Sequence, residues 1–340
     1  MTRIACGSPT LPRRAFLGGL AGAALLPGRV ARAASRPRRV AFIHSIAGDE
    51  PTVVAQILVF EASLAAAGWT IGSDLVVDYR FAEGTVERMG PLARELVARS
   101  PDVIVAVSTP VALAVREVSG GIPVVFYPVT DPVGAGLVET LDRPGGTFTG
   151  FTLFDSQPLE RWIDLMVQVV PDLGELTLVY NPLAAAGFVN LFLAAAPAIG
   201  EAAGLTLYAL TIEDEAAIPA TIAQAAGPGR GLVVLPDAFT HAATRRRAII
   251  DAAATNRLPA IYPFPEFVTD GGLMAHSVDM VTQAAAAGDY VDRILRGESP
   301  ADLPVVPPTG FVLMVNPAAA AALGLSFPDA LLAEATVIGA

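Results

Sequence analysis

The sequence contains no lysine and few residues of several other reactive types. All 22 basic side chains are arginines, which excludes Schiff-base chemistry and the phosphate-binding lysine of a Walker motif. The single cysteine, Cys6, precedes the first apolar stretch, so a chain processed beyond it has no disulfide, cysteine nucleophile or cysteine metal site. His44, His241 and His276 are far apart and lack metal-ligand spacing. We therefore expect no metal and no cofactor.

Sequence signals for catalysis and for nucleic-acid binding are also missing. The chain has no Gly-x-Ser-x-Gly elbow and no glycine-rich phosphate loop in its body, and nothing assembles a nucleophile, a base and an oxyanion site. Its 33 acidic residues outnumber the basic ones, for a net charge of -11, which argues against a phosphate-backbone binder. We expect neither an enzyme nor a nucleic-acid partner.

Length and composition indicate a large folded body. The chain has 340 residues, of which 53% are hydrophobic and 16% are charged. This composition excludes a largely disordered chain, and the length favours two domains over one.

The N-terminus has the pattern of an export signal. Arg13 and Arg14 precede an apolar stretch that ends at Leu26, and a small-x-small cleavage pattern ends at Ala33. The apolar stretch is shorter than the ~20 residues of a membrane-spanning helix. We predict a twin-arginine-type signal peptide over residues 1–33, cleaved near Ala33, and a periplasmic mature protein. A disordered basic N-terminus is the alternative.

The body of the chain alternates short Val-rich and Ile-rich runs with Ala-rich segments of helical length, which predicts βαβ units and parallel sheets. The expected strands are 40–45, 75–81, 103–108, 123–128, 176–180, 205–211, 231–235, 258–262, 272–276 and 311–315. The expected helices are 53–67, 86–99, 110–118, 159–170, 189–203, 218–226, 242–256, 281–296 and 318–323. The pattern restarts near residue 150, which indicates two similar lobes. The prolines between 300 and 308 predict an extended connector without helix.

Several spaced motifs carry a family resemblance. They are Asp131-Pro132-Val133, Arg143-Pro144-Gly145-Gly146, Thr149-Gly150-Phe151-Thr152, Leu258-Pro259-Ala260-Ile261-Tyr262, Gly271-Gly272-Leu273-Met274 and residues 290–297 and 321–325. Together they resemble the ABC-transporter substrate-binding proteins related to tryptophan and tyrosine uptake, over residues 38–332. The resemblance implies an α/β, type I periplasmic-binding-protein-like fold, with two doubly wound lobes and a ligand cleft between them. Lobe one would comprise 38–149 plus 278–305, and lobe two 152–275 plus 311–335, with a crossing at 147–152.

In open α/β sheets ligands bind outside the carboxyl ends of the strands. This rule selects ten candidate ligand-binding residues, with Phe154 included as an apolar wall: Ser45, Ser108, Thr109, Asp131, Phe154, Asn181, Asp237, Phe239, Tyr262 and His276. Ser108 and Thr109 open a helix and suit a carboxylate, whereas Asp131 suits an amino group. Purely structural roles remain open for all ten: helix caps, Asx turns, core aromatics and hydrogen-bonded histidine.

We expect an exported, monomeric solute-binding protein of an ABC importer. It would close its lobes on an amino acid or small carboxylate with an apolar side chain and deliver it to a permease in the inner membrane. A ligand-sensing receptor for a membrane signalling partner is one alternative, and an exported enzyme on the same scaffold is another.

Overall fold

The computed structural model describes residues 36–153, 158–185 and 189–339. The expected signal peptide lies outside the described residues, and so does Phe154. Residues 37–340 form one compact unit that contains two β-sheets. Among the described residues, none of the helices has the length and apolar character to cross a bilayer.

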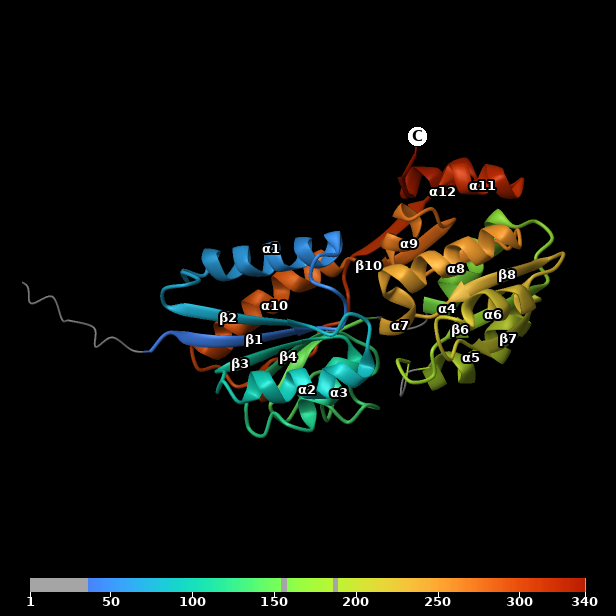
Figure 1. Ribbon diagram of the computed structural model, residues 1–340. Helices are drawn as coiled ribbons and strands as arrows, with labels where there is room; N and C mark the ends of the chain where they lie inside the picture. The colour runs from blue at the N-terminus through green and yellow to red at the C-terminus, as the bar shows by residue number, and fades with distance from the viewer. Residues whose placement is uncertain (1–35, 154–157, 186–188, 340) are drawn as a thin grey trace, which may run out of the picture. The chain divides into compact units, whose positions relative to one another are not determined.

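The first sheet has the strand order β2-β1-β3-β4-β5, and its neighbouring strands are parallel. Its strands are β1 (Arg38–His44), β2 (Leu75–Phe81), β3 (Val103–Val107), β4 (Val124–Val129) and β5 (Phe148–Thr152). Helices α1 (Pro51–Ala66) and α10 (Met280–Leu295) lie side by side on one face, while α2 (Val86–Val97) and α3 (Thr109–Arg116) cover the other (Figure 1). Strands β3 and β4 are therefore buried at every position, as their continuous apolar runs predict, whereas the edge strand β2 is fully buried only at Leu75.

The second sheet has the order β12-β11-β10-β9-β8-β6-β7. Its strands are β6 (Glu175–Tyr180), β7 (Thr206–Thr211), β8 (Arg230–Val234), β9 (Ala260–Tyr262), β10 (Met274–Val278), β11 (Phe311–Val315) and β12 (Thr336–Val337). One core joins this sheet to α4 (Pro158–Val169), α5 (Val189–Ala203), α11 (Pro317–Leu323) and α12 (Asp329–Glu334). The other joins it to α6 (Ile218–Ala225), α8 (Ala243–Thr255) and α9 (Pro265–Thr269). The short helix α7 (Ala238–His241) follows β8.

The α/β fold class with two helix-covered sheets is confirmed, and the expected strands and helices are present with small shifts at their ends. The expectation that both sheets are purely parallel is wrong at one place, because β11 runs antiparallel to β10. The assignment of residue ranges to lobes stays a prediction.

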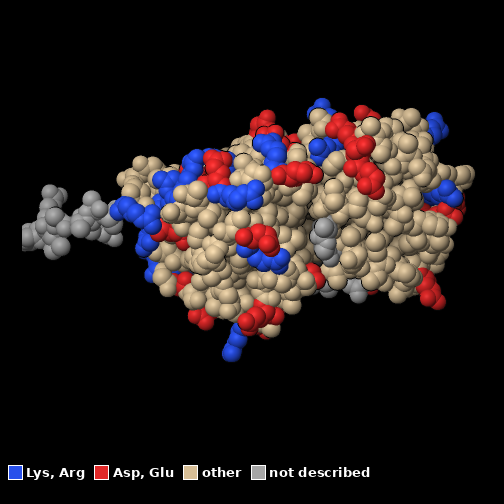
Figure 2. All heavy atoms as spheres, turned by 60° about the horizontal axis from the view of Figure 1, so that its bottom comes forward, with Lys and Arg blue, Asp and Glu red and all other residues tan. Residues whose placement is uncertain are grey.

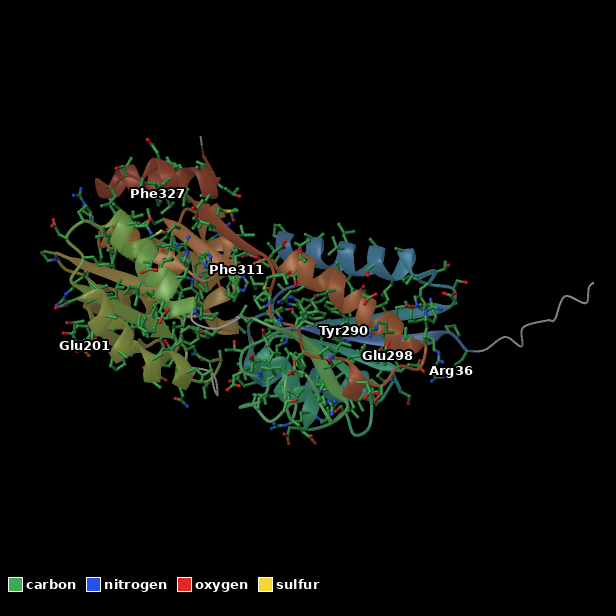
Figure 3. All side chains as sticks on the ribbon, turned by 180° about the vertical axis from the view of Figure 1, so that it is seen from behind. Arg36, Glu201, Tyr290, Glu298, Phe311 and Phe327 are labelled. Atoms are coloured by element: carbon green, nitrogen blue, oxygen red, sulfur yellow. The ribbon has the colours of Figure 1, made fainter. Side chains whose placement is uncertain are left out.

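Six short elements were not expected from the sequence: β5, α7, α9, η1 (Pro300–Asp302), α12 and β12. Two of them, β5 and η1, lie where a different structure was predicted. Residues 148–152, expected as a crossing, form the edge strand β5, where the ring of Phe151 lies 4.8 Å from that of Tyr290. Figure 3 labels Tyr290 on α10, and its hydroxyl donates a hydrogen bond of 2.8 Å to the carbonyl of Pro304. The expectation of no helix in the proline-rich connector is wrong at its start, where Pro300–Asp302 form the 3-10 helix η1. A proline in the first turn fits a helix because its missing N–H needs no partner there.

The face shown in Figure 2 is mostly uncharged, with acidic and basic side chains interspersed on it. Many of these charges pair locally. Arg38 lies 2.9 Å from Asp102, and Arg293 lies 2.7 Å from Glu298. Such exposed pairs contribute about 0–1 kcal/mol each, so the buried cores carry most of the stability.

Candidate functional site

A pocket lies where strands of both sheets end. Its wall from the first sheet follows β1, β3 and β4, with additional side chains from α1 and the start of α3. Its wall from the second sheet comes from the segment after β8, from α7 and from Phe264, and Met280 of α10 completes it. The cavity measures about 50 Å³, which is room for a few water molecules. The strand ends of the two sheets therefore share one small, partly polar space.

Three hydroxyl residues predicted from the sequence line this pocket: Ser45, Ser108 and Thr109. Ser108 is the N-cap of α3 and has a φ of 100°, a strained conformation for a residue other than glycine. Its Oγ accepts a hydrogen bond of 3.5 Å from the N–H of Val111, and Thr109 Oγ1 accepts one of 3.0 Å from the N–H of Thr130. Both hydroxyls thus cap backbone N–H groups at the edge of the pocket.

Asp237 is the fourth predicted residue that lines the pocket, and it is 5% exposed. Its Oδ1 accepts from the N–H of Thr240 at 2.7 Å and caps α7, while its Oδ2 accepts from the N–H of Asn181 at 2.9 Å. Burial raises the pKa of Asp237 to about 6, although these hydrogen bonds act in the opposite direction. The carboxylate is fixed in position but poorly solvated.

Two predicted residues follow strand ends without lining the pocket. Asp131, with a φ of 47°, forms an Asx turn in which Oδ1 accepts from the N–H of Gly134 at 2.8 Å. Asn181 directly follows β6. Its Nδ2 donates a hydrogen bond of 2.9 Å to the carbonyl of Ile212, and its Oδ1 accepts hydrogen bonds from two backbone N–H groups. The turn-forming roles that the sequence also allowed are therefore present at both positions.

The remaining predicted residues also pack away from the pocket. The guanidinium carbon of Arg245 lies over the ring of Phe239, 4.2 Å from the ring centroid. Tyr262 is 2% exposed and belongs to the core of the second sheet, and His276 stacks on Phe311 at 5.4 Å between ring centroids. Figure 3 labels Phe311 on β11. Ligand contact by these residues stays a prediction that the pocket geometry does not support.

The three lining residues that carry side-chain nitrogen atoms were not among the ten predicted ligand-binding residues: His44, Gln56 and His241. His44 Nδ1 accepts from the N–H of Ile46 at 3.0 Å, so the ring carries its proton on Nε2. Burial, reinforced by the neighbouring His241, lowers the pKa of His44 to about 3, which keeps the ring neutral at physiological pH. Gln56 is buried on the face of α1 that also buries Phe60. A glutamine on an apolar helix face was the available sequence signal.

Polar contacts beside the pocket join the second sheet's helices to loops of the first. Arg246 of α8 is 4% exposed and lies 3.2 Å from Glu50 before α1 and 2.8 Å from Asp270 after α9. Arg245 donates to the carbonyl of Gly84 at 2.9 Å. Glu50, Arg246 and Asp270 line a second, more polar cavity of about 540 Å³.

A histidine–carboxylate pair lies between the two cavities. His241 Nε2 is 3.6 Å from Glu266 Oε2, and both side chains are buried. Burial by itself would raise the pKa of Glu266, but His241 and hydrogen bonds, including one with Thr52, lower it to about 2. No group of three or more metal-ligating side chains occurs among the residues described.

Comparison with known proteins identifies the family. The family model for ABC transporter substrate binding proteins matches residues 40–338. The tyrosine-binding protein of Clostridioides difficile (strain R20291) is 24% identical over 249 residues, covering 72% of this chain and 70% of that protein.

Solved structures share the fold. A conserved domain protein from Vibrio cholerae is 29% identical with a TM-score of 0.81, over 89% of this chain and 99% of its own. An ABC domain from Streptococcus pneumoniae in complex with L-Trp has a TM-score of 0.80 at 22% identity, over 88% and 99% of the two chains. The family and its tyrosine-binding member are binding proteins rather than enzymes, and the Streptococcus pneumoniae structure holds L-Trp, in agreement with the prediction from the sequence.

Proposed function

Because this chain belongs to the family of ABC transporter substrate-binding proteins, we propose that it captures an amino acid with an apolar side chain and delivers it to the permease of an importer. The relatives that bind tyrosine and L-Trp support an amino acid as the ligand. The role is binding and release without chemical change.

One observation carries this proposal: the strand ends of both sheets contribute to one pocket. Ser108 and Thr109 come from the first sheet's side, and Asp237 comes from the second sheet's side. A ligand held by both groups gains more free energy when the two sides are close together, so binding shifts the population toward the closed arrangement.

The location and partners follow from the same proposal. Residues 1–33 act as a twin-arginine-type signal peptide, and the processed chain functions as a monomer in the periplasm. Two sequence features support this: the paired arginines before an apolar stretch and the small residues that end at Ala33. The partner is an inner-membrane permease, as the family membership implies.

Thermal unfolding of the chain beginning at residue 34, with a panel of the twenty amino acids and small organic acids, tests the proposal. A true ligand at 100 times its dissociation constant stabilises the folded state by about 2.7 kcal/mol. We expect stabilisation by one or more apolar or aromatic amino acids. If no amino acid raises the melting temperature, the proposed ligand class is wrong.

A matched pair of serine variants locates the site. Ser108→Ala removes a pocket hydroxyl, and we expect about tenfold weaker binding, the loss of one hydrogen bond to a charged group. Ser299→Ala removes a similar cap, in which Oγ accepts from the N–H of Ala301 at 3.3 Å on η1, outside the pocket. This control should bind like the unmodified chain. Equal affinities for the two variants would place the ligand elsewhere.

A further inference from the structure

The charge of the pocket is unbalanced in a way that distinguishes the two ends of an amino acid. Among the described residues that line it, Asp237 is the one carboxylate and no arginine is present. The chain has no lysine to supply a positive charge. His44 is neutral because of its burial, and His241 lies 3.6 Å from the buried carboxylate of Glu266. The pocket therefore presents a negative charge without a fixed cation.

The side that could hold a ligand carboxylate is weak by comparison. At the start of α3, Pro110 has no N–H, and the N–H of Val111 already donates to Ser108 Oγ. Thr109 Oγ1 is occupied as an acceptor by the N–H of Thr130. The donors that remain for a carboxylate are neutral hydroxyl and backbone N–H groups at the N-terminus of α3, a helix of eight residues. Neutral donors bind a carboxylate less strongly than the bidentate guanidinium used where carboxylate recognition dominates.

The other side is built for a cation. Both oxygens of Asp237 accept backbone N–H groups, from Thr240 and Asn181, so the carboxylate keeps its position without an arginine. No described arginine or histidine forms an ion pair with it. Its raised pKa shows that burial outweighs these hydrogen bonds. A ligand ammonium beside Asp237 would supply the missing counter-charge.

We propose that the ammonium group is the part of the ligand that the pocket requires, that Asp237 binds it, and that the ligand carboxylate contributes much less. The inference rests on the proposed function, in that it takes the pocket to be the amino-acid site. The ligand class is then an apolar group carrying a primary amine, and decarboxylated amino acids belong to it.

Isothermal titration of the processed chain with ligands that share one side chain tests the inference. One set is tyrosine, tyramine and 3-(4-hydroxyphenyl)propionate, and the other is tryptophan, tryptamine and indole-3-propionate. We expect the amine to bind within tenfold of its parent amino acid and the deaminated acid to bind at least a hundredfold more weakly. This comparison uses the unmodified chain, so it holds even where a variant folds poorly.

Two aspartate variants assign the effect to a residue. Asp237→Asn should weaken amine and amino-acid binding at least a hundredfold, whereas Asp214→Asn, at an exposed position outside the pocket, should leave both unchanged. Asp214 Oδ1 accepts a hydrogen bond of 2.9 Å from the N–H of Ala217, and an asparagine oxygen can accept the same bond.

The outcomes separate the inference from the proposed function. If the deaminated acid binds as well as the amino acid, or amine and acid lose affinity equally, the inference is wrong and the amino-acid site stands. If Asp237→Asn folds and still binds the amine normally, Asp237 is not the partner and the inference is also overturned. If no amino acid in the wider panel binds, both the inference and the proposed function fall.

Discussion

Two buried groups in the pocket should give opposite pH dependences to the stability of the unliganded protein. The pKa of His44 falls from 6.5 to about 3, so below pH 6.5 the unfolded chain binds a proton that the folded chain does not. Stability from His44 is therefore lost as the pH falls. The pKa of Asp237 rises from 3.8 to about 6, so between these values the folded chain binds the extra proton. Stability from Asp237 is gained as the pH falls.

The magnitudes nearly cancel in the unmodified protein. Each full proton difference changes the free energy of unfolding by about 1.4 kcal/mol per pH unit. Between pH 5.5 and 4.5 each group is near that limit, so each contributes about 1 kcal/mol, with opposite signs. Glu266, with its pKa lowered from 4.5 to about 2, adds a loss of stability toward lower pH. Comparison with the unmodified chain removes that common contribution.

Two variants separate the opposing contributions. In His44→Asn, the side-chain oxygen can replace Nδ1 as the acceptor for the N–H of Ile46. Relative to the unmodified chain, it should gain about 1 kcal/mol of stability from pH 5.5 to 4.5. Asp237→Asn should lose about the same amount over that interval. Urea titrations followed by circular dichroism at several pH values measure both slopes. Identical pH dependence in all three chains would refute the assignment of a neutral His44 and a protonatable Asp237.

The sequence predicts much of the fold because buried parallel strands leave a strong local signal. The run Val103–Val107 is apolar at every position and is buried on both faces as β3. Strand β5 was missed because Phe148–Thr152 contains a glycine and follows a turn-rich segment. A tertiary contact explains the glycine at position 150, because a Cβ there would lie 1.9 Å from the carbonyl oxygen of Phe126 on β4. The local sequence does not show this contact. The direction of β11 was missed because an apolar run does not encode whether its partner is parallel.

The candidate site was predicted in part for a related reason. The strand-end rule places backbone, and the loops that it selects carry Ser108, Thr109 and Asp237, which line the pocket. It does not predict where a side chain points, and Tyr262 at the end of β9 is directed into the core. Gln56 lies on α1, and it lines the pocket together with residues from elements of both sheets. No local sequence pattern shows that these elements come together.

Two further substitutions test tight contacts of the fold. Gly150→Ala, at a φ of 151°, would force a Cβ against β4 and should cost several kcal/mol or prevent folding, whereas Gly146→Ala meets no atom within 4 Å and should be neutral in thermal unfolding. Glu50→Ala breaks the contact with the buried Arg246, 3.2 Å away, while the guanidinium keeps its second carboxylate. We expect a loss of about 1–3 kcal/mol in unliganded stability, because a buried charge loses one of its partners. Glu298→Ala is the control, because it removes an exposed ion pair with Arg293. Loss of such a pair should lower the stability by about 0–1 kcal/mol. Both glutamate variants are compared by their free energy of unfolding in urea titrations. If the two lose the same amount, burial does not strengthen the contact between Glu50 and Arg246, and this contact contributes little to joining the elements of the two sheets.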